Sequence, residues 1–390
     1  MPALLWLTAT GFAGFAALMP IAPLWAVHGG ANEAGAGLVN GVLLLATVLT
    51  QPFVPTLLRR LGTGRVLAAG LLLLGLPSPF HLVSDELGWI LGLALFRGVG
   101  FGIITVTGSA AVAQLVRPAR RGAAIGAYGA AIAVPQLLLM PAGPWLAAAV
   151  GPWLVFLLGA LPLAGTVAAP RLAAALRAAA RAPHTTSRDS PDSRAVTREE
   201  RIRRLIAKLL PPMALLLAVT LAAGALITFA PQMSTSPVTA TIGLTLLTAS
   251  AAFTRWRVGE LADQHGARPF LWPLVLVTTL GMVLAALAVR DPGATNVVLL
   301  PVGMVLVGVA YGGLQNLTLL LSLGAVGPRD YGTASAVWNI GFDAGTGLGS
   351  VLVGFLAAGV SFPVALLAAA GISLLTLPLA LLRGRGRAAG

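Results

Sequence analysis

Long stretches without a charged residue fill most of this sequence, and each is long enough to cross a bilayer, which takes about 20 apolar residues in a helix. Hydrophobic residues make up 57% of the 390 positions and charged residues only 9%. An ordinary soluble domain carries about 25% charged residues. Because so few charges cannot cover a surface in water, we predict that lipid surrounds this chain.

Charged residues and clusters of glycine, proline and asparagine divide the chain into twelve apolar segments. Lipid offers no partner to backbone polar groups, so each segment is predicted to be a transmembrane helix. The first six are predicted at residues 3–27, 34–58, 65–83, 88–116, 120–149 and 151–171. The last six are predicted at residues 205–231, 238–257, 269–289, 296–326, 330–358 and 362–382. The expected fold is an all-α membrane protein with twelve transmembrane helices.

One long polar stretch, from Arg171 to Lys208, separates the two sets of six segments. Its middle, residues 182–193, is rich in proline and polar residues and is predicted to be a flexible linker. We therefore expect a six-helix bundle over residues 1–171, a basic linker over 172–204 and a second six-helix bundle over 205–390.

The arginines show which side of the membrane each loop occupies. With the N-terminus inside, only Arg290 falls in an outside loop and only Arg97 lies within a span. By the positive-inside rule, the linker and both termini are cytoplasmic. The net charge of +13 does not indicate nucleic-acid binding, because the arginines end apolar segments and do not share one face. Arginine supplies nearly all the basic residues, as in GC-rich bacterial genomes, so we expect a bacterial inner membrane.

Sequence motifs of enzymes are missing. The chain has no cysteine, and it has no P-loop, His-Glu-x-x-His or Gly-x-Ser-x-Gly motif. We therefore expect no enzyme activity, no cofactor and no metal site.

The two halves repeat one another weakly. A shift of 210 residues places Gly98-Val-Gly-Phe-Gly102 on Gly308-Val-Ala-Tyr-Gly312, and a shift of 204 places the segment 59–62 on 263–266. Transporters built from two parallel six-helix repeats bind their substrate between the repeats. The sequence therefore predicts two pseudo-symmetric halves with a site at their interface.

The segment Gly259-Glu-Leu-Ala-Asp-Gln-His-Gly-Ala-Arg268 follows the eighth span. Its second glycine permits a tight turn, and its aspartate can accept hydrogen bonds from a helix N-terminus or from the arginine. This segment resembles the loop signature of the major facilitator superfamily. The resemblance implies twelve spans, alternating access and transport of a small molecule. The loop after span 2 is a degraded copy with arginine where the family usually has aspartate. The predicted gating residues are Gly259, Asp263, Gly266, Arg268, Arg59 and Gly62.

Two weaker resemblances, and one departure in span 5, bear on coupling and direction. Arg97, in Leu93-Ala-Leu-Phe-Arg-Gly-Val-Gly-Phe-Gly102, resembles the span-4 arginine of proton-coupled members, and the proline-rich end of span 1, residues 19–23, is also similar to the family. Span 5 contains the glycines and prolines of the antiporter signature without its usual spacing. Together they favour an exporter.

Arg97 and Asp343 lie deep within spans, where a charge costs several kcal/mol unless it is paired or hydrated. The repeat aligns Asp343 with Ala133, so the fold itself does not require the acid. We predict that Asp343 takes up and releases a proton and that Arg97 tunes this step. Two alternatives stay open: Arg97 bonds to helix carbonyls, and Asp343 belongs to a static ion pair.

Polar residues form stripes along several spans. Ser335, Asn339, Asp343, Thr346 and Ser350 follow helical spacing on one face of span 11, and spans 2, 5 and 10 carry further polar positions. Such stripes are expected to line a central cavity. The predicted substrate-binding residues are Asn339, Gln315, Asn316, Tyr311, Gln136, Thr346 and Asn40.

These features together favour a monomeric secondary transporter that exchanges protons for a small organic compound, such as a drug or a metabolite, and exports it. Its partners would be the substrate, protons and the lipid bilayer, with no nucleic acid. One alternative is an importer, in which Asp343, Asn339 and Gln315 bind a polar or cationic nutrient. An alternative of another class is a membrane receptor that transports nothing.

Overall fold

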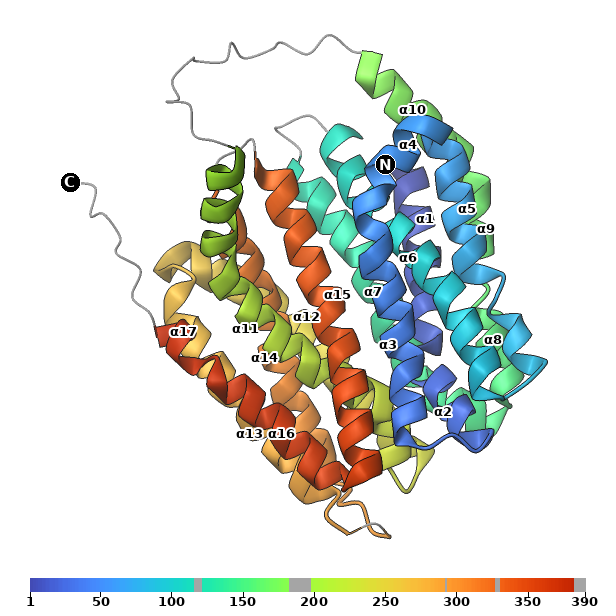
Figure 1. Ribbon diagram of the computed structural model, residues 1–390, viewed down its shortest axis with the longest axis vertical. Helices are drawn as coiled ribbons and strands as arrows, with labels where there is room; N and C mark the ends of the chain where they lie inside the picture. Colours follow the sequence, from blue (N-terminus) through green and yellow to red (C-terminus); the bar gives the residue numbers. More distant parts are fainter. Residues whose placement is uncertain (116–120, 182–197, 292, 327–329, 382–390) are drawn as a thin grey trace.

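The computed structural model describes residues 1–115, 121–181, 198–291, 293–326 and 330–381 (Figure 1). In these ranges every regular element is a helix. Twelve helical segments are long and apolar enough to cross a membrane, which confirms the predicted fold class. The middle of the predicted linker and the last nine residues of the chain, 382–390, lie outside the described ranges.

Six spans make up the N-terminal half, and several are divided into shorter helices near a proline or a glycine. They are formed by α1 (Pro2–Leu18) with α2 (Ile21–His28); α3 (Glu33–Thr50) with η1 (Gln51–Phe53) and α4 (Val54–Leu61); α5 (Thr63–Gly75) with η2 (Pro79–Leu82); α6 (Leu87–Leu115); α7 (Arg121–Ala149); and α8 (Pro152–Leu158) with α9 (Pro162–Gly165), η4 (Thr166–Ala168) and α10 (Ala169–Arg181).

The C-terminal half contains the other six spans, most of them continuous helices. They are formed by α11 (Arg198–Met233); α12 (Pro237–His265); η5 (Arg268–Phe270) with α13 (Leu271–Ala288); α14 (Leu299–Gly324); α15 (Tyr331–Gly359); and α16 (Phe362–Leu375) with α17 (Leu377–Leu381).

Three predicted boundaries are wrong in the same direction, because helices continue beyond the apolar segments. Helices α10 and α11 extend into the region predicted as linker, up to Arg181 and from Arg198. Helix α12 extends to His265, so Gly259 and Asp263 are helical and not part of a loop. Charged residues end an apolar segment but are good helix formers, so they do not end a helix.

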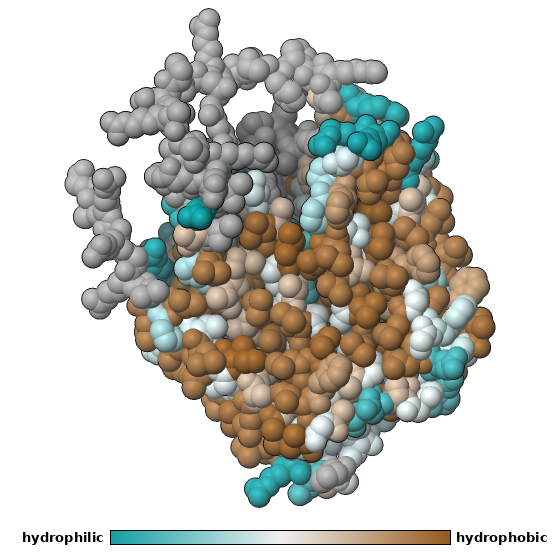
Figure 2. Space-filling view, in the orientation of Figure 1, coloured by the Kyte–Doolittle hydropathy of each residue, from teal (hydrophilic) through white to brown (hydrophobic). Residues whose placement is uncertain are grey.

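The two halves form two bundles that lie side by side, with α1–α10 on one side and α11–α17 on the other (Figure 1). Met1, Arg181 and Arg198 lie at the same end, which we call the linker end. The opposite end, with the turns at residues 29–32 and 360–361, is the far end. In Figure 2, hydrophilic residues gather at both ends and the flank between them is mostly hydrophobic, as lipid requires.

Equivalent glycines pack in the same way in both halves, which supports the predicted repeat. A Cβ atom at Gly98 of α6 would collide with the carbonyl oxygen of Leu43 in α3. At Gly308 of α14, it would collide with that of Leu247 in α12. The glycines differ by 210 residues and the leucines by 204, the two shifts seen in the sequence. Only glycine lets the backbones approach this closely.

The turns after spans 2 and 8 share one backbone conformation. Gly62 has φ 85° and ψ 144°, and Gly266 has φ 78° and ψ 161°. Positive φ is readily adopted by glycine and strains other residues. Among the predicted gating residues, Gly62 and Gly266 are thus the two that the backbone conformation of these turns favours as glycine.

Close packing of α3 against α15 joins the two bundles toward the far end. A Cβ atom at Gly37 would collide with the carbonyl oxygen of Ser350, and one at Gly354 would stand 2.6 Å from the carbonyl oxygen of Glu33. Small residues here allow the two backbones to touch. The bundles are therefore in direct contact on the far side of their interface.

Replacing Gly37 with leucine is expected to push α3 and α15 apart, because overpacking a tight interface costs about 1–3 kcal/mol. The chain has no cysteine, so spin labels attached at Val83→Cys and Val360→Cys report the separation of the bundles at the far end. Double electron–electron resonance between the two labels should give a longer distance when Gly37→Leu is present than when it is absent. Gly92→Leu is the control, because a Cβ there meets nothing within 4 Å. Unchanged distances in Gly37→Leu would show that the interface absorbs the side chain.

Candidate functional site

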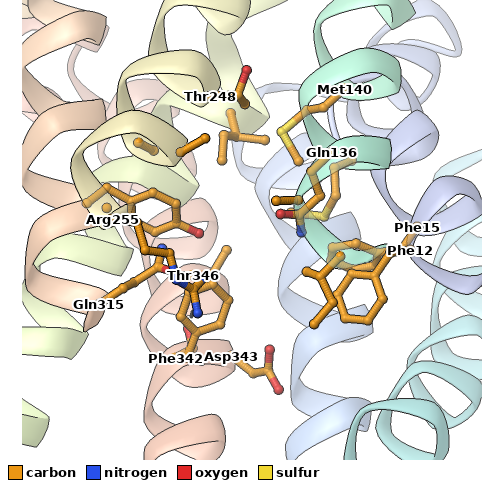
Figure 3. Close-up of a pocket in the computed structure, with 18 of the residues that line it drawn as sticks. Phe12, Phe15, Gln136, Met140, Thr248, Arg255, Gln315, Phe342, Asp343 and Thr346 are labelled. Carbon is orange, nitrogen blue, oxygen red and sulfur yellow. Dashed lines mark hydrogen bonds between the residues drawn. The ribbon is translucent and has the colours of Figure 1, made fainter. Parts of the chain in front are cut away.

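A cavity lies between the two bundles, with about 1120 Å³ of empty space, part of which is open to solvent. Helices α1, α3, α6 and α7 line it from the N-terminal half, and α11, α12, α14 and α15 line it from the C-terminal half (Figure 3). Small-molecule sites often form at such interfaces between domains. The cavity is therefore the candidate substrate site of this chain.

The wall from the N-terminal half is mainly apolar and aromatic. Phe15 and Phe101 stack with their ring centroids 3.9 Å apart, and Phe12 meets Phe101 edge-on at 5.3 Å. Met140 and Gln136 of α7 complete this side in Figure 3. Gln136 is the one predicted substrate-binding residue on this wall.

The wall from the C-terminal half carries most of the polar side chains of the cavity, as the stripes of spans 10 and 11 predict, beside the stacked rings of Trp338 and Phe342. Five predicted residues line it, and α14 and α15 supply all of them. Their helical spacing turns them toward one face. They are Tyr311, Gln315, Asn339, Asp343 and Thr346.

Asp343 is 4% exposed and bonds across the interface between the bundles. Its Oδ2 atom accepts a hydrogen bond of 2.6 Å from Nε2 of Gln51, which follows α3 in the other half. Oε1 of the same amide is buried and has no hydrogen-bond partner. The pair thus joins the two halves within the cavity region, and one of its polar atoms remains free.

Arg255 of α12 is the second charged residue in the described lining of the cavity, although it lies near the end of predicted span 8 and was expected among the cytoplasmic arginines. It is exposed to the cavity, and its Nη1 atom donates to Oε1 of Gln315 at 3.2 Å. The repeat could have indicated this position, because the shift of 204 residues places Arg255 on Gln51, which bonds Asp343 beside the cavity.

Two predicted substrate-binding residues lie outside the described lining. Nδ2 of Asn40 donates to the carbonyl oxygen of Met19 at 2.8 Å and to Oγ1 of Thr228 at 2.9 Å, and Thr228 bonds Ser350 at 2.7 Å. Asn40 therefore helps to join the bundles. Nδ2 of Asn316 bonds the carbonyl oxygen of Arg255 at 2.7 Å, so it fixes α14 to α12. Buried amides often satisfy backbone groups in this way.

Residues 4–256 and residues 213–389 match the family model described as Major Facilitator Superfamily, and together these ranges cover nearly the whole chain. The chain belongs to the major facilitator superfamily. It is thus a transporter of the major facilitator type, and the resemblance of its eighth-span motif is confirmed at the level of the family.

Solved superfamily transporters share this fold. The chain is similar to a bacterial homolog of the human lysosomal transporter Spinster, in an inward-facing and unoccupied conformation, with a TM-score of 0.73 and 15% identity over 97% of this chain and 95% of that one. It is also similar to the nucleoside transporter NupG, with a TM-score of 0.64 and 13% identity over 97% and 98%. No curated protein sequence matches the chain.

The residues of the superfamily gating motif lie on the surface at the end of α12. Asp263 and Arg268 are exposed and do not pair with each other, whereas Arg257 bonds Glu260 at 3.2 Å. In the corresponding turn, Arg59 donates to Oγ1 of Thr56 at 3.0 Å. The part that the motif plays in gating this superfamily member stays a prediction.

Arg97 lies away from the described cavity lining, in the interior of the N-terminal bundle, and is 2% exposed. Its Nη2 donates to the carbonyl oxygen of Gly14 at 3.1 Å and its Nε to that of Leu74 at 3.4 Å. Arg97 thus links α6 to α1 and α5, the carbonyl-bonded alternative left open by the sequence. We infer that it stabilises packing within its own bundle.

If Arg97 acts through packing, Arg97→Met should keep the free energy of unfolding within about 1.5 kcal/mol, because the volume changes little. Arg97→Ala should lower it by about 2–5 kcal/mol, because a cavity remains. Thermal unfolding in detergent measures both. The control is Arg257, where methionine and alanine should each cost less than about 1 kcal/mol. An equal, large loss in both Arg97 variants would show that the buried charge itself is needed.

Proposed function

We propose that this transporter exports a small organic compound in exchange for protons, with the linker end facing the cytoplasm. The two bundles would rock about the cavity, exposing it first to one side of the membrane and then to the other. Asp343 would carry the proton, and the polar wall on α14 and α15 would bind the substrate.

The observation that carries this proposal is the hydrogen bond between Asp343 and Gln51. It is a contact between the two bundles that involves a titratable group, and it lies beside the cavity. Ionisable residues buried in membrane proteins often mark proton pathways. Protonation of Asp343 would therefore directly alter a hydrogen bond between the two bundles.

Protonation would change this contact in a defined way. An ionised Asp343 can only accept hydrogen bonds, so it takes the Nε2 proton of Gln51. A protonated Asp343 becomes a donor, and the unpartnered Oε1 of Gln51 would accept its proton once the amide turns over. Both protonation states would thus have a bonded form, with different arrangements across the interface.

The packing of the bundles supports assigning this conformation to the state open toward the linker end. Close contacts at Gly37 and Gly354 and the Asn40–Thr228 bond hold the far side together. Arg255, nearer the linker end, is exposed. The inward-facing state of the Spinster homolog agrees with this assignment. In this state the cavity would take up substrate from the cytoplasm.

Substrate-induced proton release tests the proposal. Purified protein in weakly buffered detergent should release protons when a binding compound is added from a panel of small aromatic amines, acids and amides, because substrate and proton compete for Asp343. A pH-sensitive dye reports the release. Asp343→Asn should bind the compound and release none.

Asp85→Asn is the matched control, because Asp85 pairs with His28 at the far end, away from the described cavity lining. It should release protons like the wild type. Release that persists in Asp343→Asn would contradict the role of Asp343. Binding without release in any variant, with substrate counterflow in vesicles that have no proton gradient, would favour the importer. No binding and no counterflow would favour the receptor.

A further inference from the structure

The cavity contains two opposite charges that do not pair with each other. Within the described part of the chain, Asp343 and Arg255 both line the cavity, and no ion pair joins them. In Figure 3 they extend from different helices, α15 and α12. The cavity therefore has a negative position and a positive position that stay separate.

Within the described residues, each charge has a neutral side-chain amide as its hydrogen-bond partner. Gln51 donates to the carboxyl group at 2.6 Å, and Gln315 accepts from the guanidinium group at 3.2 Å. An amide satisfies one hydrogen bond and leaves the charge uncompensated. Asp343 is held away from bulk water, where an unpaired charge is costly, whereas Arg255 is exposed in the cavity and keeps donors for a ligand. The most complementary occupant would bring one charge of each sign.

Tyr311 of α14 also lines the cavity, in the same half of the chain as both charges. Thr346 and Asn339 lie on the same polar wall. The two charges and these neutral groups thus line one cavity, so the same bound molecule can meet both signs of charge.

The opposite wall sets the remaining requirement. Phe12, Phe15 and Phe101 form an aromatic cluster, with Met140 beside it. These side chains offer no charge and favour an apolar group. A fully polar zwitterion would leave this surface unused.

We propose that the substrate is a small zwitterion with an apolar body, of the chemical class of an amino acid with an aromatic or large aliphatic side chain. Its carboxylate binds Arg255 and Gln315, its ammonium group binds Asp343, and its side chain packs on the aromatic wall. This inference rests on the proposed function for the direction of transport and for the role of Asp343. It adds Arg255 as the residue that selects for a carboxylate.

The assignment fits proton exchange. An ammonium group and a proton compete for Asp343, so the arrival of one displaces the other. An anion without an amine would be repelled by ionised Asp343 and would bind together with the proton. The cationic end of the zwitterion is therefore the part that makes exchange possible.

Four probes with one phenyl scaffold test the proposal in the full-length protein in detergent. They are L-phenylalanine, phenethylamine, 3-phenylpropionate and 3-phenylpropanamide. The rise of the melting temperature with probe concentration gives each dissociation constant. Phenylalanine should bind at least about tenfold more tightly than any other probe, because it alone forms both charge-assisted contacts.

Variants assign each end of the ligand. Arg255→Gln should remove the advantage of phenylalanine over phenethylamine, and Asp343→Asn should remove its advantage over 3-phenylpropionate. Arg257→Gln and Asp85→Asn are matched controls outside the described cavity lining and should retain the full preference. Since each control removes the same charge from the chain, a general electrostatic effect would appear there too.

Equal binding of phenethylamine and phenylalanine, with no effect of Arg255→Gln, would overturn the proposal in favour of a cation. Equal binding of 3-phenylpropionate would overturn it in favour of an anion. Lack of binding by phenylalanine up to millimolar concentration would also overturn it. These outcomes differ from failure of the proposed function, which is read from proton release. Zwitterion selectivity without proton release would keep this inference and refute proton exchange.

Discussion

In a bilayer, lipid offers no hydrogen bond to a polar group between helices, so such groups tend to find their partners in the protein. This requirement explains most polar residues of the chain. Many threonines bond the carbonyl oxygen one turn earlier in their own helix, as Thr279 does to Val275 at 3.0 Å and Thr278 to Leu274 at 2.9 Å. Their hydroxyl groups are satisfied locally and carry no information about a substrate. Polar residues whose partners come from the other bundle are different, because they report how the halves meet.

Arg97 and Arg255 show how the same side chain takes opposite roles under this constraint. Both belong to helices of the spans, but Arg97 donates to two backbone carbonyl oxygens inside one bundle. Arg255 donates to a side-chain amide and remains exposed in the cavity. A guanidinium group bonded to helix carbonyls stabilises a fixed arrangement. One held by a single neutral amide keeps hydrogen-bond donors for a ligand.

Much of the fold could be predicted from the sequence, because the length and apolarity of each segment determine whether it spans lipid. The stripe on span 11 also placed Asn339, Asp343 and Thr346 on the cavity, since helical spacing fixes which residues share a face. The partner of Asp343 could not be predicted. Gln51 lies in the other half of the chain, and only the packing of α3 against α15 brings it near.

Arg255 was hidden for a related reason. An arginine near the end of an apolar segment is usually cytoplasmic, and only the continuation of α12 to His265 shows that Arg255 lies a full two turns and more inside a helix. Asn40 and Asn316 show the opposite case, because both lie outside the described cavity lining. Their polarity suggested a ligand, but their amides bond the carbonyl oxygens of Met19 and Arg255. The sequence shows which residues share a face of a helix, but it does not show which neighbouring helix packs against that face.

The cavity combines a symmetric backbone with asymmetric chemistry. Shifts of 210 and 204 residues relate lining positions of the two halves in pairs: Phe101 and Tyr311, Thr105 and Gln315, Ala133 and Asp343, Gln136 and Thr346, and Leu44 and Thr248. In each pair both members face the cavity. In most pairs the more polar member belongs to the C-terminal half. The repeat therefore supplies two similar walls that can rock against each other, and the substitutions between them give the ligand an orientation. The pseudo-symmetric fold allows alternating access, while its departures from symmetry at Asp343 and Arg255 decide what is bound.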